Sequence, residues 1–334
     1  GMKKNLSLFI FTIIFSVILI ELILIISGKY SNLTKNKLIP SDAIYERPTL
    51  SEQKQKHPDL DYIITNFFDA DGVKNFDQIS TSQKKNIIGI FGDSMTENIA
   101  IDRKFEYSNL INDKLSSDNL VNYGVGGYSA DQSFIRYLKY KDHDLSHVFL
   151  FLMPGDEGFS TESLFLDNGK YKIYKPKLNI FYQFIGKVNL TYLFIDSFYS
   201  IRNLIKKDHT TIQTNNYNSV LANKINHKFF SKDLIPCNQT PSLCEKNLSN
   251  LLKVFKKEVE KNNAKFHILI YPEKTYVSYI IKILKNIGEE FNYHIIDKKL
   301  AVMREDKKKD LIFINDSHWN EYGNLAFANN LLNI

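Results

Sequence analysis

Short apolar runs alternate with segments of helical spacing along the chain from Asn86 onward. The apolar runs have the length of buried strands and cover residues 86–91, 119–124, 147–153, 266–272 and 293–297. The segments between and after them carry one apolar face and predict helices over 107–115, 130–141, 248–259, 276–291 and 321–332. This alternation predicts a mostly parallel, doubly wound α/β sheet, in which ligands bind at the carboxyl ends of the strands.

The N-terminal 28 residues follow a different pattern. Residues 6–26 are almost wholly apolar, a length that suits a transmembrane helix. No A-x-A-like cleavage site follows, so we expect residues 1–28 to form an uncleaved signal anchor. Lys3 and Lys4 favour an N-terminus inside the cell. The main domain would then face the periplasm or the exterior, held at a bacterial inner membrane.

Two other stretches lack a clear period. Residues 29–84 are polar, with scattered prolines and charges, and we interpret them as a linker and a small extension. Within them, Asp71-Gly72 predicts the turn of a hairpin over 62–76. Residues 159–247 are rich in Tyr, Phe, Asn and Lys and are interpreted as an insertion or lid. The main domain is expected to span residues 85–334.

Composition and charge exclude some functions. The chain has 334 residues, of which 43% are hydrophobic, enough for a sizeable core. The net charge is +6, but the lysines are scattered and no nucleic-acid module is recognisable, so we expect no nucleic-acid partner. The two cysteines, Cys237 and Cys244, lack the paired spacing of a zinc site. With an anchor present, a disulfide is favoured over two free thiols.

A serine follows the first apolar run, in the block Gly92-Asp93-Ser94. A serine in this place can begin the next helix, where backbone N–H groups and the helix dipole favour negative charge. They would stabilise the oxyanion that forms when the serine attacks a carbonyl. The alternative is an ordinary helix N-cap, and Asp93 is expected to brace this loop.

A histidine follows the last apolar run, in Asp316-Ser317-His318-Trp319. Such a histidine can act as a general base whose imidazole is oriented by a nearby carboxylate. The alternative is a surface loop with helix-capping side chains. We expect Trp319 to pack between this loop and the last helix; the alternative is that it forms a wall of the active site.

A third block, residues 121–132, places a glycine-dense loop after the second strand. Such a loop lets backbone N–H groups point into a site. It does not have the G-x-G-x-x-G spacing of a dinucleotide loop, because Ser129 stands where the last glycine should be. We expect no metal and no organic cofactor.

Together the three blocks resemble those of the SGNH/GDSL hydrolases, in particular membrane-anchored bacterial forms with a C-terminal D-x-H-W motif, similar to polysaccharide O-acetylation proteins. The resemblance implies a three-layer α/β/α sandwich with a flavodoxin-like sheet. It implies that Ser94 is the nucleophile, His318 the base and Asp316 the carboxylate that orients it. The oxyanion would be bound by Ser94, Gly127 and the residue at position 155.

The chain departs from the family at position 155, where Gly155 stands in place of the expected asparagine. Losing one such donor costs about 100- to 1000-fold in rate. A residue such as Asn122, or a backbone N–H, could supply the missing hydrogen bond.

The resemblance implies an esterase or an O-acetyltransferase acting on an envelope or exported glycan, with a membrane-bound acyltransferase as a partner. One alternative is an inactive protein of the same fold that binds or assembles glycans. The other is a lipase or thioesterase, whose acyl pocket would be lined by the aromatic residues of 159–204.

Overall fold

The computed structural model describes residues 2–27, 46–47, 49–57, 59–69, 71–74, 86–157, 164–165, 169–172, 241–301, 311–313 and 318–334. The chain divides into two compact units. One comprises Gly1–Lys37 and Lys177–Phe229, and the other comprises Leu38–Pro176 and Phe230–Ile334. The second unit holds all three sequence blocks that suggest chemistry.

The described part of the first unit is helix α1 (Met2–Ser27). Most apolar side chains between Phe11 and Ile26 of this helix are exposed, whereas Leu24 is buried. Among the residues that the structure describes, however, no helix meets the length and apolarity needed to cross a membrane. The predicted transmembrane helix is therefore not supported by the structure.

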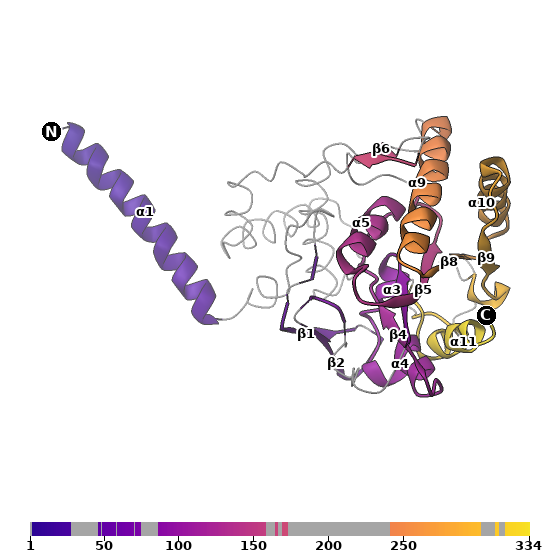
Figure 1. The fold of residues 1–334 in the computed structure, drawn as a ribbon. Helices are drawn as coiled ribbons and strands as arrows, with labels where there is room; N and C mark the ends of the chain where they lie inside the picture. Colours follow the sequence, from indigo (N-terminus) through magenta and orange to yellow (C-terminus); the bar gives the residue numbers. More distant parts are fainter. Residues whose placement is uncertain are drawn as a thin grey trace. The chain divides into compact units, whose positions relative to one another are not determined.

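A five-stranded parallel sheet forms the centre of the second unit (Figure 1). Its strands are β3 (Asn86–Phe91), β4 (Asp118–Asn122), β5 (Leu145–Leu152), β8 (Lys265–Ile270) and β9 (Asn292–Ile295). Their spatial order is β4-β3-β5-β8-β9, and every neighbouring pair is parallel. This is the flavodoxin-like order, and the predicted mostly parallel α/β sheet is confirmed. The order reverses between β3 and β5, where this architecture binds its ligands.

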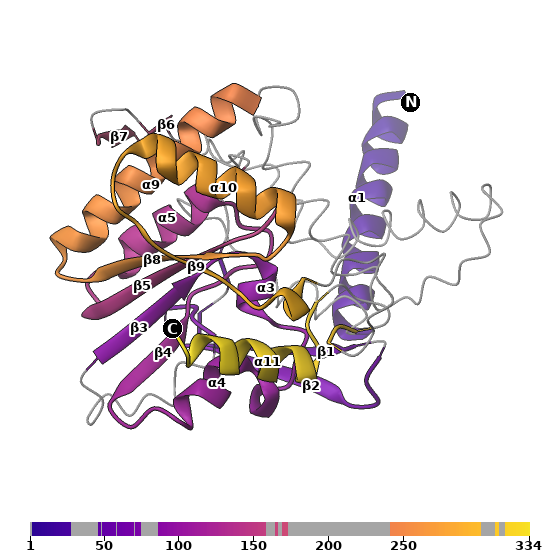
Figure 2. The ribbon, with the colours of Figure 1, turned by 90° about the vertical axis from the view of Figure 1, so that its right-hand side faces the viewer.

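Helices cover both faces of this sheet, which gives three layers (Figure 2). One face carries α5 (Ala130–Tyr140), α9 (Pro241–Lys261) and α10 (Lys274–Ile287). The other carries α4 (Tyr107–Asn112) and α11 (Glu321–Leu331). The single-turn elements are α3 (Ser94–Glu97), η2 (Arg103–Phe105) and η3 (Lys298–Leu300).

The helices form where their sequence has one apolar face and suitable ends. In α9 the predicted apolar face is fully buried against the sheet and comprises Leu248, Leu251, Leu252, Phe255 and Val259. In α10, Glu273 caps the first turn by accepting the N–H groups of Thr275 and Tyr276. Gly288 ends that helix at φ 73°, a left-handed conformation that glycine adopts without strain.

A two-stranded antiparallel sheet precedes the main one, formed by β1 (Ser51–Lys56) and β2 (Ile63–Phe68). The predicted hairpin over 62–76 is therefore only partly correct. Asp71-Gly72 does lie in a turn, and Phe68 and Lys74 form a short bridge across it. The main partner of β2 nevertheless precedes it in the chain, because a longer ladder to residues 51–56 satisfies more backbone groups.

Most of the predicted insertion, 159–247, lies outside the described residues. Its interpretation as a lid therefore stays a prediction. Its described parts include the short antiparallel pair β6 (Leu164–Phe165) and β7 (Tyr171–Lys172). They also include Cys244 at the start of α9, which is buried and disulfide-bonded. No described cysteine is free, which agrees with the favoured disulfide, while Cys237 lies outside the described residues.

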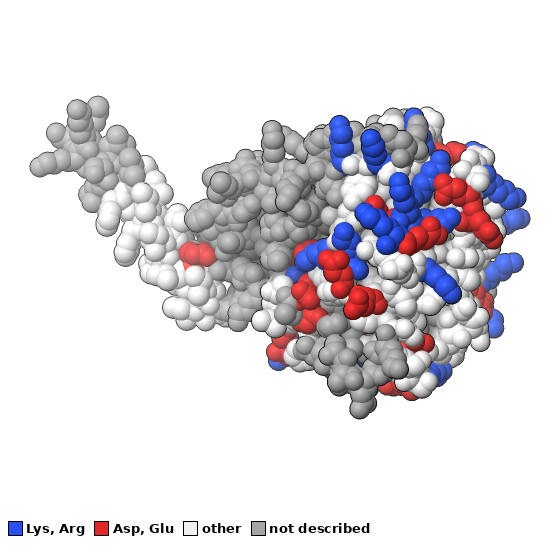
Figure 3. Space-filling view, in the orientation of Figure 1, with Lys and Arg blue, Asp and Glu red and all other residues white. Residues whose placement is uncertain are grey.

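Basic and acidic side chains are interspersed on the described part of the face in Figure 3. Several basic side chains pair with acids, as in the contacts of Lys256 with Glu260 and Glu289. This pattern is typical of a solvated surface.

Candidate active site

Ser94 begins helix α3 directly beyond the carboxyl end of β3. Asp93 is the N-cap of this helix, and its carboxylate accepts the N–H of Met95 at 2.9 Å. Asp93 therefore braces the loop, as expected from the sequence. The N–H of Ser94 itself has no acceptor among the residues that the structure describes. A partly exposed serine thus lies at a helix start with its own backbone donor unused.

The glycine-dense loop after β4 passes directly against Ser94. A Cβ built on Gly126 would lie 3.5 Å from the Cβ of Ser94. At Gly124 a Cβ would lie 2.5 Å from the backbone nitrogen of Glu97, so only glycine fits this close approach. The sequence predicted a glycine loop beside the serine, and the structure brings the two together.

Hydrogen bonds fix this loop at several successive residues. The N–H of Gly124 donates to Asn122 Oδ1 at 3.0 Å, that of Val125 to Gly92 O at 3.1 Å, and that of Gly126 to Glu97 Oε2 at 2.7 Å. The N–H of Gly127, at φ 79°, has no acceptor within the described residues. Gly127 and Ser94 therefore both retain a backbone donor for an oxyanion.

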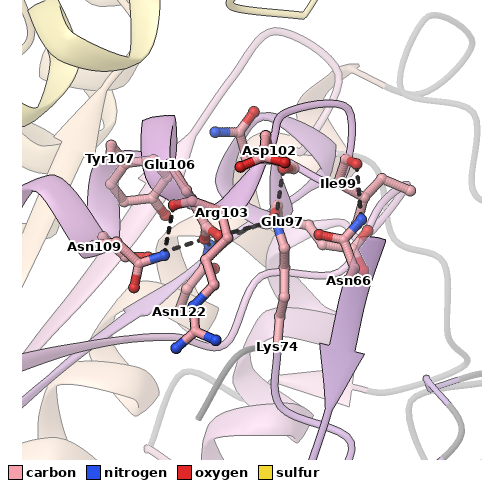
Figure 4. Close-up of polar contacts among 12 residues, drawn as sticks. Asn66, Lys74, Glu97, Ile99, Asp102, Arg103, Glu106, Tyr107, Asn109 and Asn122 are labelled. Atoms are coloured by element: carbon pink, nitrogen blue, oxygen red, sulfur yellow. Dashed lines mark hydrogen bonds and ion pairs between the residues drawn. The ribbon is translucent and has the colours of Figure 1, made fainter. Parts of the chain in front are cut away.

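Asn122 does not supply the missing third donor. Its Nδ2 donates to Thr96 O at 2.6 Å and to Glu106 Oε1 at 3.1 Å, while its Oδ1 accepts from Gly124. Figure 4 shows this side chain directed toward Glu106. Both ends of the amide are engaged inside the protein, which excludes this alternative.

Gly155 follows β5 at φ 104°, and no atom of the described residues lies within 4 Å of a Cβ built on it. Its N–H donates to Glu157 Oε2 at 2.8 Å. The residue that replaces the expected asparagine therefore offers open space and no side-chain donor.

Two carboxyl groups, Asp93 and Asp156, lie close enough at the switch point of the sheet to affect each other's titration. Burial raises the pKa of Asp156 well above its usual range, and the charge of Asp93 raises it further. Burial also raises the pKa of Asp93, but the Met95 N–H and a positive charge on His318 oppose this. Burial and the charge of Asp93 therefore both favour the protonated form of Asp156.

Asp156 had no role in the sequence analysis, although it lies just after the third strand, at the switch point of the sheet. Its Oδ2 accepts the Met153 N–H at 2.8 Å, and its backbone carbonyl accepts the Ala130 N–H at 2.9 Å. Asp156 thus links the loop after β5 to the start of α5. The position of the residue, immediately after a buried strand, is the signal that could have found it.

His318 lies in electrostatic reach of the nucleophile loop, since its charge lowers the pKa of Asp93. Its backbone carbonyl accepts the N–H of Phe313 at 3.1 Å, and the neighbouring Trp319 bridges to Ile312. Asp316 lies outside the described residues, so the hydrogen bonds of the Ser94, His318 and Asp316 set stay a prediction.

Trp319 is buried, 1% exposed, against Phe151 and Phe327. The expectation that it packs between the last loop and the last helix is confirmed. Asn324 on α11 then ties this region to the nucleophile loop, because its Oδ1 accepts from the Asn98 side chain and from the Tyr107 N–H. These contacts place the block that carries His318 beside the block that carries Ser94.

The described residues contain no group of three or more His, Cys, Asp or Glu side chains that could hold a metal ion. Within the described residues the site offers a serine, two backbone N–H groups without an acceptor, and a histidine in electrostatic reach of the nucleophile loop. This arrangement can carry out acyl transfer, in which the donors stabilise a tetrahedral oxyanion.

Comparison with known proteins gave similarity to solved structures alone. No family model and no curated protein sequence matches the chain. The chain is similar to the crystal structure of TesA, with a TM-score of 0.40 and 10% identity over 74% of this chain and 97% of that chain. It is similar to a member of the lipolytic protein G-D-S-L family from Veillonella parvula DSM 2008, with a TM-score of 0.38 and 15% identity over 75% and 98% of the two chains.

A third similar structure is a putative lipolytic protein of the G-D-S-L family from Desulfitobacterium hafniense DCB-2. Its TM-score is 0.38, with 9% identity over 74% of this chain and 98% of that chain. Likeness at these scores and identities carries no argument about activity, so function is inferred from the residues of this chain.

Proposed function

We propose that this protein is a serine ester hydrolase or O-acyltransferase of the SGNH type, with Ser94 as its nucleophile. The observation that carries the proposal is the close approach of the Gly124–Gly127 loop to Ser94, while the N–H groups of Ser94 and Gly127 both lack an acceptor among the described residues. Backbone donors beside the nucleophile are what an acyl-transfer oxyanion requires.

In the proposed reaction Ser94 Oγ attacks the ester carbonyl as His318 takes its proton. The tetrahedral oxyanion accepts the N–H groups of Ser94 and Gly127. When the tetrahedral intermediate collapses, the bond to the alcohol breaks and His318 donates its proton to the departing alcohol. The acyl group stays bound to Ser94 as an acyl-serine. Water or a sugar hydroxyl then attacks the acyl group, with His318 taking the proton of the attacking group and returning it to Ser94 Oγ. Asp316 orients the imidazole in both acylation and deacylation.

The proposed substrate is an acylated envelope or exported glycan, met outside the cytoplasm. Two observations support this location. Cys244 is disulfide-bonded, and disulfides persist mainly in oxidising compartments. The apolar run of residues 6–26 and the exposed apolar side chains of α1 favour attachment to a membrane. A membrane-bound acyltransferase is the proposed partner in the transfer case.

A fluorophosphonate probe tests the proposal on the full chain in a mild detergent. The wild type is expected to be labelled, whereas Ser94→Ala is not labelled and His318→Ala is labelled far more slowly. Ser249→Ala is the matched control, because Ser249 donates only to its own helix, to Glu245 O. Labelling that persists in Ser94→Ala would refute the assignment. Rates on p-nitrophenyl esters of increasing chain length then separate an acetyl-specific enzyme from a lipase or thioesterase.

A second candidate function is a glycan-binding protein without catalysis. It is favoured by Gly155, which offers no side-chain donor and whose N–H donates to Glu157. This candidate predicts no labelling of the wild type together with saturable binding of acetylated oligosaccharides in calorimetry. Labelling at Ser94 would eliminate it.

A further inference from the structure

Glu97 ends helix α3, three residues after Ser94, and takes no part in the proposed reaction. Its side chain is 1% exposed. Oε1 accepts from Arg47 Nε, and Oε2 accepts both Arg47 Nη2 at 2.8 Å and the Gly126 N–H at 2.7 Å. One buried carboxylate therefore joins the N-terminal extension to the glycine loop.

The Gly126 end of this connection lies directly beside the nucleophile. A Cβ on Gly126 would lie 3.0 Å from Glu97 Oε2 and 3.5 Å from Ser94 Cβ. The next residue is Gly127, whose N–H is the unused donor. Because successive peptide planes share an α-carbon, fixing the Gly126 N–H restricts where the Gly127 N–H can point.

The Arg47 end lies in the extension, for which no sequence motif predicts a part in the chemistry. Arg47 is buried and lies over the ring of Phe68, with 5.6 Å between its Cζ and the ring centroid. Its planar fork matches a carboxylate with two parallel hydrogen bonds. Lys74, also from the extension, donates to the backbone carbonyls of Glu97 and Asn98, and Figure 4 shows it reaching toward Glu97.

The charges of this connection hold the carboxylate ionised inside the protein. Burial alone raises the pKa of Glu97, but Arg47, the Gly126 N–H and Lys74 together lower it below its usual range. Taking such a pair out of water costs several kcal/mol per ion, so a buried pair by itself is weak evidence of a role in stability. An ionised Glu97 does accept the glycine amide more strongly than a neutral side chain would.

We infer that Glu97 and Arg47 are positioning residues that hold the Gly126–Gly127 peptide so that the Gly127 N–H meets the oxyanion. The inference rests on the proposed function. It makes the extension a working part of the active site, because Arg47, which lies in the extension, supplies the guanidinium that Glu97 binds.

The experiment compares Glu97→Gln and Arg47→Lys with wild type in the full chain. Glu97→Gln keeps the shape of the side chain but turns an N–H₂ toward Arg47 or Gly126. We expect kcat on a p-nitrophenyl ester to fall by as much as about 100- to 1000-fold, the range for loss of an oxyanion donor, with KM nearly unchanged. Arg47→Lys keeps the charge but not the fork, so an intermediate loss is expected.

Glu46→Gln is the matched control. Glu46 is another buried carboxylate of the extension, and it pairs with Arg136 and Lys139 on α5 without contacting Gly126. It is expected to lower the melting temperature without the selective fall in kcat. A fall in kcat of equal size in Glu46→Gln would overturn the inference, and so would wild-type kcat in Glu97→Gln.

A second measurement does not depend on activity. Hydrogen exchange of the Gly126 amide is expected to speed up in Glu97→Gln and to stay unchanged in Glu46→Gln. If the wild type takes no fluorophosphonate, the proposed function fails while this exchange still reports on the positioning. Unchanged exchange in Glu97→Gln would overturn the positioning role whether or not the protein is an enzyme.

Discussion

Replacing Lys74 with methionine removes one partner of a buried ion pair. Lys74 Nζ lies 3.1 Å from Glu106 Oε2, and the two side chains are 2% and 1% exposed. Nζ also donates to the carbonyls of Asn98 and Glu97, at 2.7 and 3.3 Å. The dashed contacts of Figure 4 show how closely this cluster is connected. Lys74→Met leaves a carboxylate and two carbonyls without this cation.

Removing one partner of a buried ion pair is expected to lower the free energy of unfolding by about 3–5 kcal/mol. For a unit of this size that corresponds to a fall in melting temperature of about 6–20 °C. Removing both charges, in Lys74→Met with Glu106→Gln, leaves no unpaired ion. Asn122 and Ser108 can still donate to the glutamine oxygen at position 106. The double variant is therefore expected to regain at least about 2 kcal/mol over additivity.

Trp319 is the only tryptophan of the chain and is buried in the α/β unit, so its fluorescence reports the unfolding of that unit. Urea titrations of the wild type, both single variants and the double variant give the coupling free energy. A cost of less than about 1 kcal/mol for Lys74→Met, the range of an exposed pair, would refute the reasoning. Simple additivity of the two single changes would refute it as well.

Three further predictions use other parts of the structure. Asn324→Ala is expected to cost about 1–3 kcal/mol in the same titration, because the buried Tyr107 N–H loses its acceptor; a neutral change would contradict this. Gly124→Ala is expected to abolish labelling of Ser94 and to lower the melting temperature, since the new Cβ would lie 2.5 Å from backbone; normal labelling would contradict it. Burial, with His147, His294 and Lys265, lowers the pKa of His267 to about 4. The unfolded state, with a histidine pKa near 6.5, then binds more protons, so stability is expected to fall as pH drops from about 6.5 toward 4. The ring is half-buried, so the loss is about 1–2 kcal/mol, and His267→Phe should flatten this part of a melting temperature–pH curve; an equal slope in that variant would argue against it.

The parallel sheet could be predicted because its signal is local. Each strand is a short apolar run, each covering helix has one apolar face, and their alternation permits few arrangements. The α9 face from Leu248 to Val259 was recognisable in this way and is buried as expected. The hairpin over 62–76 was only partly correct: its turn and the Phe68–Lys74 bridge are present, but β2 also pairs with residues 51–56, which carry no apolar alternation that would have revealed them.

The sequence by itself determined the order of the elements. It also determined the candidate catalytic residues, namely Ser94, the glycine loop and His318. Their types and their places after strands are properties of the chain alone. Only the tertiary structure decided which backbone donors stay unused, that Asn122 is occupied, and that Asp156 shares a site with Asp93. It alone brought Arg47 to Glu97 across fifty residues of chain. Such pairings arise because burial gathers distant polar groups and obliges them to satisfy one another, and no local pattern records the partner.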